Sequence, residues 1–258
     1  MKRMLIFIMG LFLAAFLGGC VTDKETLKIE NSLPENKLAY YNDSFDTLRE
    51  DLWDKAGLVF TDTQLANIKI ADMTIEDGRL RIDTKTGGFS KGGLISKFAL
   101  RGDFDVQTDF QSDFVPGEFD MDQFLSLMAI EEKKSGKPTR LFIIGLGKKG
   151  KNKINGIFSG YHEGDKYHSR YWHPINNFTG SLRFVRIGDN VSTFYRKQGQ
   201  NRWKKMCTLP SGKIDTLIGF GLYNFIKGRN SIRATRSISA WIDNFFINAA
   251  QEIIESEI

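Results

Sequence analysis

The sequence predicts an all-β fold, an antiparallel β-sandwich of about fourteen short strands. Three observations carry this prediction. Runs of alternating polarity recur along the chain, turn-forming residues separate them at spacings of roughly 8 to 12 residues, and no long helical period occurs within residues 40–247. The 258 residues include 21 Phe and 4 Trp, which is enough apolar material for one sizeable core.

The clearest single pattern is the run SLRFVRIGDNVSTFYR, residues 181–196. Two alternating segments are joined by Gly188, Asp189 and Asn190, which are turn formers. This pattern predicts a β-hairpin in the centre of the sandwich. A glycine-broken loop and Trp203 follow it.

Further strands are expected on both sides of this hairpin. The pair Asp77-Gly78 predicts a tight hairpin, and Arg101-Gly102-Asp103 predicts a turn. The expected strands are 42–46, 72–76, 78–84, 94–100, 104–114, 124–130, 140–147, 155–162, 167–172, 203–209, 217–225 and 239–247. The tail 248–258 lacks a strand pattern and is expected to form a short amphipathic helix through Ile253, Ile254 and Ile258.

The N-terminus has the features of an export signal. Lys2 and Arg3 precede an apolar run that is too short to be a spanning helix, and small residues lead to Cys20. The end of this segment, Leu-Gly-Gly-Cys, resembles the bacterial lipobox. That resemblance implies cleavage before Cys20, acylation of Cys20, and a lipid-anchored protein of the cell envelope, with the bilayer as its first partner. Since no aspartate follows Cys20, it also implies outer-membrane sorting, with the domain facing the periplasm.

The expected organisation is therefore a signal peptide over 1–19, a polar tether over 20–39, the sandwich domain over 40–247 and a tail over 248–258. Cys207 is the only cysteine besides Cys20, so the mature chain is expected to contain no internal disulfide. Removal of Lys2 and Arg3 with the signal lowers the formal net charge from +5 to about +3. Much of the rest lies in residues 133–170, a basic stretch that fits either an anionic polymer or solvated hairpin tips.

Three segments together resemble the concanavalin A-like lectin/glucanase superfamily. They are GDFDVQTDF at 102–110, the 181–196 hairpin with Trp203 after it, and AWIDNFFI at 240–247. The resemblance covers about Tyr40 to Ile247. It implies a jelly roll in which the first strand, around Phe45, lies beside the last strand, around Phe245. Members of this superfamily bind or cleave glycans, and many have no known role.

Glucanases of this superfamily carry a Glu-x-Asp-x-Glu strand that supplies a nucleophile and an acid/base. The segment Glu118-Phe119-Asp120-Met121-Asp122 is similar, although its last acid is Asp, and it follows Pro-Gly. Retaining hydrolysis needs two carboxyls roughly 5 Å apart, which alternate residues of one strand can provide. Glu118, Asp120 and Asp122 are therefore catalytic candidates, with a polar loop as the alternative.

The strand pair 155–162 and 167–172 provides a candidate sugar site. If Glu163 to Lys166 is the turn, alternation puts His162 and His168 on opposite faces, which argues against a shared zinc ion. The same register puts Tyr161, His168, Arg170 and Trp172 on one face. Aromatic planes and hydrogen-bond donors together suit a sugar ring. The alternative is an aromatic rim packed under a loop. The opposite face, with Phe158, Tyr167 and Tyr171, is the better core candidate, and Trp203 is either a second platform or buried.

The superfamily resemblance also implies a structural calcium ion near the terminal strand. Asp243 is the matching ligand, and Asp46 is a weaker one. An ordinary hydrogen-bonded turn is the alternative. The pattern Gly145-x-Gly147-x-x-Gly150 does not indicate a dinucleotide site because no helix follows it, and no nucleic-acid partner is expected.

Three functions are consistent with these observations. The first is a lipid-anchored, non-catalytic, lectin-like module that binds glycan or another envelope component. The second is a glycoside hydrolase or lyase of the same fold that uses Glu118 and Asp120. The third is a structural or assembly lipoprotein with a protein partner. The sequence does not name the ligand.

Overall fold

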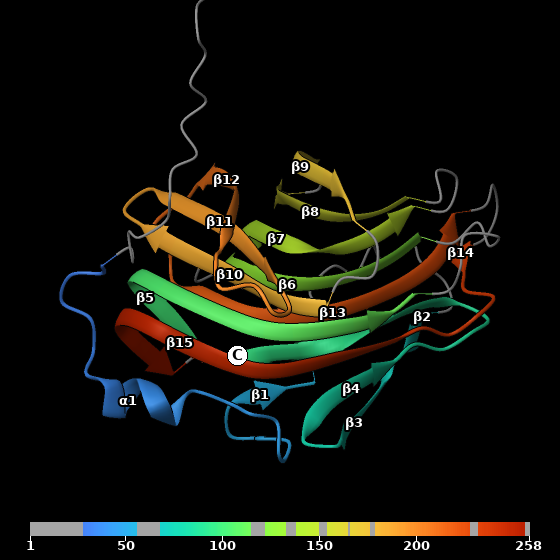
Figure 1. Cartoon of the computed structure of the whole chain (residues 1–258), viewed down its shortest axis with the longest axis horizontal. Helices are drawn as coiled ribbons and strands as arrows, with labels where there is room; N and C mark the ends of the chain where they lie inside the picture. Colours follow the sequence, from blue (N-terminus) through green and yellow to red (C-terminus); the bar gives the residue numbers. More distant parts are fainter. Residues whose placement is uncertain are drawn as a thin grey trace, which may run out of the picture.

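A computed structural model describes residues 28–55, 68–114, 122–132, 138–149, 154–164, 166–175, 179–227 and 232–255. These residues form an antiparallel β-sandwich, as the sequence predicts, with fifteen strands and one short helix among the described residues. The long strand β5 (Phe89–Asp113) takes part in both layers, which we call sheet I and sheet II (Figure 1).

Sheet I is built on the first half of β5. In spatial order its strands are β9 (Lys166–Pro174), β8 (Ile154–Glu163), β7 (Pro138–Lys149), β6 (Asp122–Glu132), β13 (Thr216–Lys227) and β5. Three short strands complete its edges: β1 (Trp53–Asp54) and β2 (Ile68–Ile70) pair with β5, and β14 (Ile232–Arg233) pairs with β13.

Sheet II is built on the second half of β5. Its strands are β12 (Lys204–Pro210), β11 (Asn190–Lys197), β10 (Thr179–Ile187), β5, β15 (Ser239–Glu255), β4 (Arg79–Asp83) and β3 (Asp72–Glu76). The hairpin β10–β11 pairs residue for residue, from Gly180 with Lys197 to Ile187 with Asn190. It lies near one end of this sheet, since only β12 is beyond it.

The core lies between the sheets. Period-two alternation sends every second side chain of a strand inward. Phe220, Leu127 and Ile144 enter from sheet I, while Phe104 and Phe184 enter from sheet II, and all of them belong to one buried cluster. Burial of this apolar surface, at about 25 cal/mol per Å², is the main force that holds the two sheets together.

The two ends of the folded chain meet, as the superfamily resemblance implies. The backbone N–H of Asp43 donates to the carbonyl of Phe245 at 2.9 Å, and the N–H of Phe245 donates back at 2.8 Å. The Asp43 carboxylate accepts hydrogen bonds from the Phe45 backbone and from the Trp53 indole. Burial of this carboxyl raises the pKa of Asp43.

The predicted turn at residues 101–103 is wrong. β5 continues through it, and Gly102 instead forms a β-bulge, with a φ of 73°. Three steps of β5, from Arg101 to Phe104, oppose two steps of β15, from Glu252 to Ala250. The extra residue bends the strand, and its partner changes from β13 to β10 at this point.

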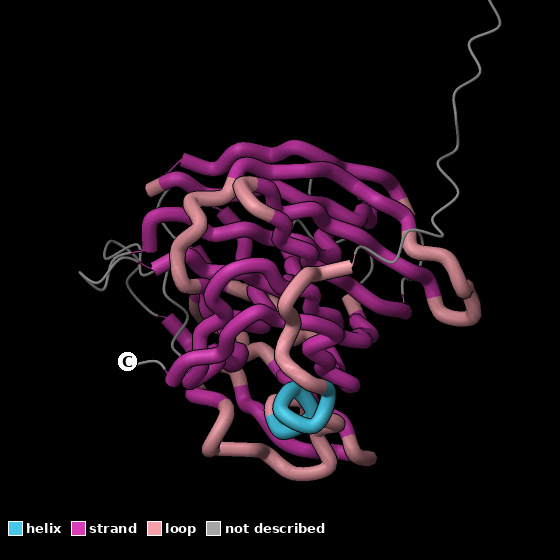
Figure 2. The backbone as a smooth tube through the Cα atoms, turned by 90° about the vertical axis from the view of Figure 1, so that its left-hand side faces the viewer, coloured by secondary structure: helices cyan, strands magenta, loops and turns pink. Residues whose placement is uncertain are grey.

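The predicted boundaries of the domain are also corrected. The expected helix in the tail is strand: β15 runs to Glu255, and Ile253 and Ile254 pair with Leu100 and Ala99 of β5, just before the Gly102 bulge. Part of the expected tether is folded, because Ile29 and Leu38 are buried and the Leu33 N–H donates to the Ala250 carbonyl. Helix α1 (Glu35–Tyr40) packs against β15 at one end of the stacked strands (Figure 2).

The expected signal peptide and Cys20 lie outside the described residues, as do Glu118 and Asp120. Within the residues described, no helix has both the length and the apolar character that crossing a bilayer requires.

Candidate functional site

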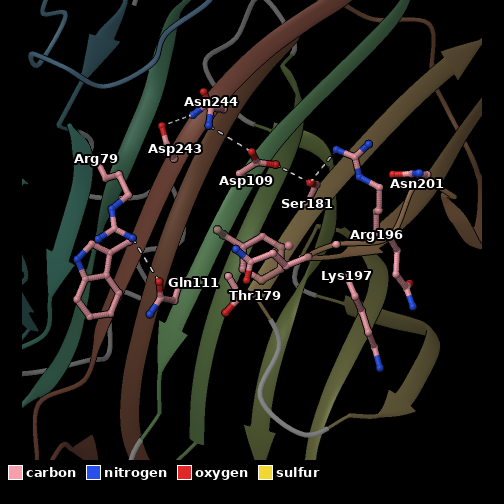
Figure 3. Close-up of a pocket in the computed structure, with 16 residues that line it drawn as sticks. Arg79, Asp109, Gln111, Thr179, Ser181, Arg196, Lys197, Asn201, Asp243 and Asn244 are labelled. Atoms are coloured by element: carbon pink, nitrogen blue, oxygen red, sulfur yellow. Dashed lines mark hydrogen bonds between the residues drawn. The ribbon is translucent and has the colours of Figure 1, made fainter. Parts of the chain in front are cut away.

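A groove of about 520 Å³ crosses the outward face of sheet II (Figure 3). β15, β5 and β10 form its floor, the end of β11 and the turn after it form one bank, and Arg79 of β4 forms part of the other. It is lined by Arg79, Asp109, Phe110, Gln111, Thr179, Gly180, Ser181, Arg196, Lys197, Gln198, Gly199, Gln200, Asn201, Trp241, Asp243 and Asn244.

Strand alternation puts polar side chains on this face. On β5, Phe104, Val106 and Phe110 point into the core, so Asp109 and Gln111 point outward. The same rule turns Ser181 of β10 and Trp241 of β15 outward, because the residues on either side of each are buried, and Asp243 shares the face of Trp241.

Register aligns these side chains across the sheet. Asp243 of β15 is opposite Asp109 of β5, which is opposite Ser181 of β10, which is opposite Arg196 of β11. Arg79 continues this row on β4, since the residue after it, Leu80, pairs with the residue before Asp243. The groove therefore follows one row of directly paired residues across five adjacent strands.

A chain of hydrogen bonds links this row (Figure 3). The Arg196 guanidinium donates to Ser181 Oγ at 3.2 Å, and Ser181 Oγ donates to Asp109 Oδ1 at 2.5 Å. The Asn244 amide donates to Asp109 Oδ2 at 3.3 Å, and the Asn244 backbone N–H donates to Asp243 Oδ1 at 2.7 Å. Both oxygens of Asp109 are thus engaged by neighbouring protein groups.

A second β-bulge shapes the floor. Asn244 has a φ of 49°, and the pairing of β15 with β5 shifts by one residue after Asp243. The Thr108 hydroxyl donates to the Asp243 carbonyl at 2.9 Å and holds this bulge in place. Asparagine tolerates the left-handed backbone conformation better than most residues. The bulge therefore aims the Asn244 side chain at Asp109.

Tryptophans support the arginines on each bank. Arg79 and Arg81 lie over the Trp241 ring, 5.8 and 5.5 Å from its centroid. On the opposite bank Arg196 lies 4.6 Å from the Trp203 centroid, and Arg183 lies over the same ring at 5.4 Å. Such stacking fixes the plane of a guanidinium while its N–H edges stay free to donate. Trp203 is therefore a support for arginines and not a bare platform.

Next to the groove, Arg183 forms an ion pair with Asp105. Arg183 Nε donates to Asp105 Oδ1 at 2.7 Å, and its terminal nitrogen reaches the other carboxylate oxygen. The Asp105 side chain is 5% exposed and that of Arg183 is 14% exposed. This bidentate pair links the side chains of β5 and β10 beside the groove.

The surroundings of the Asp243 carboxyl disfavour its charged form. Burial raises the pKa of Asp243, and the negative charges of Asp109 and Asp46 act in the same direction. The hydrogen bond from Asn244 and the positive charge of Arg79 oppose the shift. The groove floor thus disfavours a second full negative charge beside Asp109.

The pairing of β8 with β9 differs in part from the register on which the expected sugar site depends. The predicted pairs His162 with Tyr167 and Tyr161 with His168 are confirmed. Beyond them a bulge between Ser159 and Gly160 shifts the register, so Trp172 pairs with Phe158.

The consequence is that the four expected residues do not share a face. Tyr161 is buried in the core, His168 stacks on it at 4.7 Å between centroids, and Arg170 lies over its ring at 5.6 Å. Trp172 stacks on Phe158 at 5.9 Å, on the outward side of sheet I. The prediction of one face with Tyr161, His168, Arg170 and Trp172 is wrong because an unrecognised bulge reverses the side chains after it.

The other expected faces change for the same reason. Tyr171 packs against the core cluster, as predicted, whereas Phe158 and Tyr167 lie on the outward side of sheet I, where the tilted rings of Tyr167 and His162 are 4.9 Å apart between centroids. His162 and His168 do lie on opposite faces, and the described residues contain no group of three His, Cys, Asp or Glu side chains that could hold a metal ion.

The expected calcium ligands lie near each other. The Asp46 charge contributes to the raised pKa of Asp243, but Asp46 accepts a hydrogen bond from Ser44, and one oxygen of Asp243 accepts the Asn244 N–H. Two engaged carboxylates fall well short of the six to eight oxygens that Ca²⁺ takes. The side chains of Asp46 and Asp243 therefore do not make a calcium site by themselves, and a bound calcium ion stays a prediction.

Only one of the expected catalytic acids is described. Asp122 begins β6, two residues before Phe124, and pairs with residue 225 of β13. In the basic stretch, Arg140 forms an ion pair with Glu163 and Lys148 is buried, so neither is a freely solvated hairpin tip.

The groove of sheet II was not predicted as a site. The alternation of Asp105, Gln107, Asp109 and Gln111 with buried residues is visible in the sequence and shows that this face is polar. The partner strands that bring Arg79, Ser181 and Arg196 beside it are distant in the chain, and one sequence does not reveal that pairing.

Comparisons with known proteins identify the fold. No family model matches the sequence, and no curated protein matches it. Among solved structures, the CBM2 module of the evolved Dit of Lactobacillus casei BL23 phage J-1 aligns with a TM-score of 0.55 at 8% identity, over 81% of this chain and 95% of that chain.

Two further structures are similar over most of their length. LamA of Zobellia galactanivorans, in complex with laminaritriose and laminaritetraose, has a TM-score of 0.54 at 12% identity, over 85% of this chain and 99% of that chain. A protein described as an immunostimulatory antigen and pseudo beta-1,3-glucanase of Mycobacterium tuberculosis has a TM-score of 0.54 at 10% identity, over 84% and 98%. At such identities these similarities establish the fold alone, the concanavalin A-like jelly roll.

Proposed function

We propose that this jelly roll is a non-catalytic, lectin-like module that binds a polysaccharide of the cell envelope in the groove of sheet II. The observation that carries the proposal is the groove itself. Its volume of about 520 Å³ lies within the range typical of small-molecule sites, roughly 300–1,000 Å³. It is open along a row of paired residues, which suits an extended chain.

The lining has the two kinds of group that a sugar requires. Trp241 lies half-buried in the lining, and the part of its ring that Arg79 and Arg81 leave uncovered is the aromatic surface that we assign to the C–H face of a pyranose ring. Gln111, Thr179 and Asn201 supply amide and hydroxyl groups for its hydroxyls. A sugar is amphipathic in the same way, with an apolar face and a polar rim, so both parts of the lining have a role.

The carboxylates of the groove favour binding over hydrolysis. A retaining glycosidase needs one carboxylate free to attack and one acid free to protonate the leaving group. Both oxygens of Asp109 are taken up by Ser181 and Asn244, and Asp243 accepts the Asn244 N–H. These acids hold the floor in shape and are not presented as a catalytic pair.

The structural relatives are compatible with this role. The fold is shared by a carbohydrate-binding module, by LamA with bound oligosaccharides and by a protein described as a pseudo-glucanase. The fold thus supports glycan binding with and without catalysis, and the choice for this chain comes from its own groove.

Equilibrium binding of the purified full-length protein to a polysaccharide panel, with release of reducing ends assayed in parallel, tests the proposal. We expect binding without cleavage. Trp241→Ala should weaken binding by about ten-fold or more, because it removes a stacking surface worth on the order of 1–2 kcal/mol. Tyr40→Ala is the matched control, since Tyr40 is an exposed aromatic on α1, outside the groove. Release of reducing ends by the native protein would favour the hydrolase alternative.

We further propose that the module is anchored by an acylated Cys20 and faces the periplasm from the outer membrane. The support is the lipobox-like end of the first twenty residues. Several acyl chains give stable attachment where one chain is marginal. Cys20→Ala should move the protein from the membrane fraction to the soluble fraction and remove the mass of the lipid. An unchanged distribution would contradict the anchor and leave the groove proposal untouched.

A further inference from the structure

The two arginines of the groove, Arg79 and Arg196, have no carboxylate partner within the described chain. Five arginines elsewhere lie within 4 Å of a carboxylate oxygen: Arg49, Arg81, Arg101, Arg140 and Arg183. Arg79 and Arg196 have no such ion pair within the described chain. Arg79 donates to the Gln111 amide oxygen at 3.3 Å, and Arg196 donates to the Ser181 hydroxyl at 3.2 Å.

Both guanidinium groups are nevertheless held in place. Arg79 lies over Trp241 and Arg196 lies over Trp203, so each cation is oriented by stacking and by one neutral hydrogen bond. An arginine has five N–H donors in a fixed planar fork. Most of the donors of these two side chains are therefore oriented toward a partner that the described chain does not supply.

The acids between these arginines do not fill that need. Asp109 is occupied by Ser181 and Asn244, and Asp243 is partly buried with a raised pKa. Lys197 lies at the edge of the same groove, exposed and without an ion pair in the described part of the chain. The acidic groups on the floor of the groove thus accept hydrogen bonds from the protein, whereas the cationic groups on its banks form no ion pair within the described chain.

We infer that the groove selects a polysaccharide that carries anionic groups, carboxylate or sulfate. Arg79 and Arg196 each engage an acidic substituent from opposite banks, and Lys197 adds a third positive charge. β4 and β11 are four strand spacings apart, about 19 Å at roughly 4.8 Å per spacing. The ligand therefore spans several sugar rings, with acidic groups on more than one of them. This inference rests on the proposed function and narrows its ligand class.

Binding of the purified full-length protein to polygalacturonate and dextran sulfate, against neutral laminarin and dextran, tests the inference. We expect the anionic polymers to bind at least ten-fold more tightly at low salt, and their affinity to fall as ionic strength rises. Comparison of the two anionic polymers shows whether carboxylate or sulfate is preferred.

Charge-removing variants locate the interaction. Arg79→Gln and Arg196→Gln should each weaken polygalacturonate binding about ten-fold and thereby reduce its preference over laminarin. Arg101→Gln is the matched control, since it removes one positive charge from an exposed ion pair outside the groove. Lys197→Gln should weaken binding about three-fold, and because this side chain is exposed the variant keeps the test valid if an arginine variant fails to fold.

Each other outcome overturns a defined claim. If neutral polymers bind as tightly and the glutamine variants have no effect, the inference is wrong and the proposed function stands. If no polysaccharide binds, the proposed function is wrong as well. If vesicles with 30% anionic lipid or double-stranded DNA bind through Arg79 and Arg196 while polysaccharides do not, the ligand class inferred here is wrong.

Discussion

The outward faces of the two sheets differ in chemistry although the same strand, β5, supplies both. On sheet I the outward side carries an apolar patch, in which each residue is at most 4% exposed: Ile95, Ala99, Met128, Ile130, Leu141 and Leu217. On sheet II the outward side is a row of charged and polar residues with an open groove. The shared core fixes only the inward side of each strand. The outward sides are thus free to differ in chemistry from one sheet to the other.

The largest expected difference in the free energy of unfolding is between two lysine substitutions, one on the outward side of each sheet. Met128→Lys buries an ammonium in the apolar patch, where Met128 is 1% exposed. Burial of an unpaired charge is among the few changes that cost more than about 4 kcal/mol, so this variant should be largely unfolded. Gln107→Lys on sheet II should change the free energy of unfolding by about 0.5 kcal/mol or less. Urea denaturation of both variants measures the contrast, and a folded Met128→Lys protein would contradict it.

A smaller effect should come from the ion pair beside the groove. Removal of one partner, as in Asp105→Ala, leaves the Arg183 guanidinium partly buried without its carboxylate, which costs roughly 3–5 kcal/mol in buried pairs. The double variant Asp105→Leu with Arg183→Met should lose less than Asp105→Ala alone, because no charge is left unpaired. A double-mutant cycle of Asp105→Leu, Arg183→Met and the double variant, followed by chemical denaturation, measures this coupling. Additive losses would mean that the pair is solvated and does not stabilise the link between β5 and β10.

The sequence predicts these two faces to different degrees. The alternation in residues 104–111 indicates a strand with one polar face, and the nearly continuous apolar run 124–130 indicates a strand buried on both faces. Both indications agree with the structure. Hairpins joined by local turns, such as Asp77-Gly78, are also predictable, since both residues adopt positive φ angles that favour Asp and Gly.

The misses come from β-bulges and distant pairings. The bulge at Gly102 resembles a turn in sequence, and the bulge after Ser159 reverses the face of Trp172. A period-two pattern of polarity does not show where one residue of a strand has no partner on the neighbouring strand. The groove itself depends on β4 and β11 lying on either side of β15, β5 and β10, which is a property of topology and not of any one segment.

The smallest expected effect is on the pH dependence of the free energy of unfolding. It distinguishes Asp243 on the groove floor from the exposed acids of the same face. The folded-state pKa of Asp243 is raised above its ordinary value of 3.8, chiefly by burial, so protonation of Asp243 favours the folded protein. That contribution is fully present below pH 3.8 and is lost as the pH rises through the folded-state pKa.

The variant Asp243→Asn should remove this dependence. Its amide oxygen still accepts the Asn244 N–H, but it never carries the negative charge beside Asp109. The stability of the variant relative to the native chain should therefore rise with pH above 3.8 and level off once Asp243 is fully ionised. Urea unfolding of both proteins from pH 4 to 7 measures this difference. A constant difference across that range would mean that Asp243 is solvated like the exposed acids of sheet II, and that the floor of the groove does not resist a second negative charge.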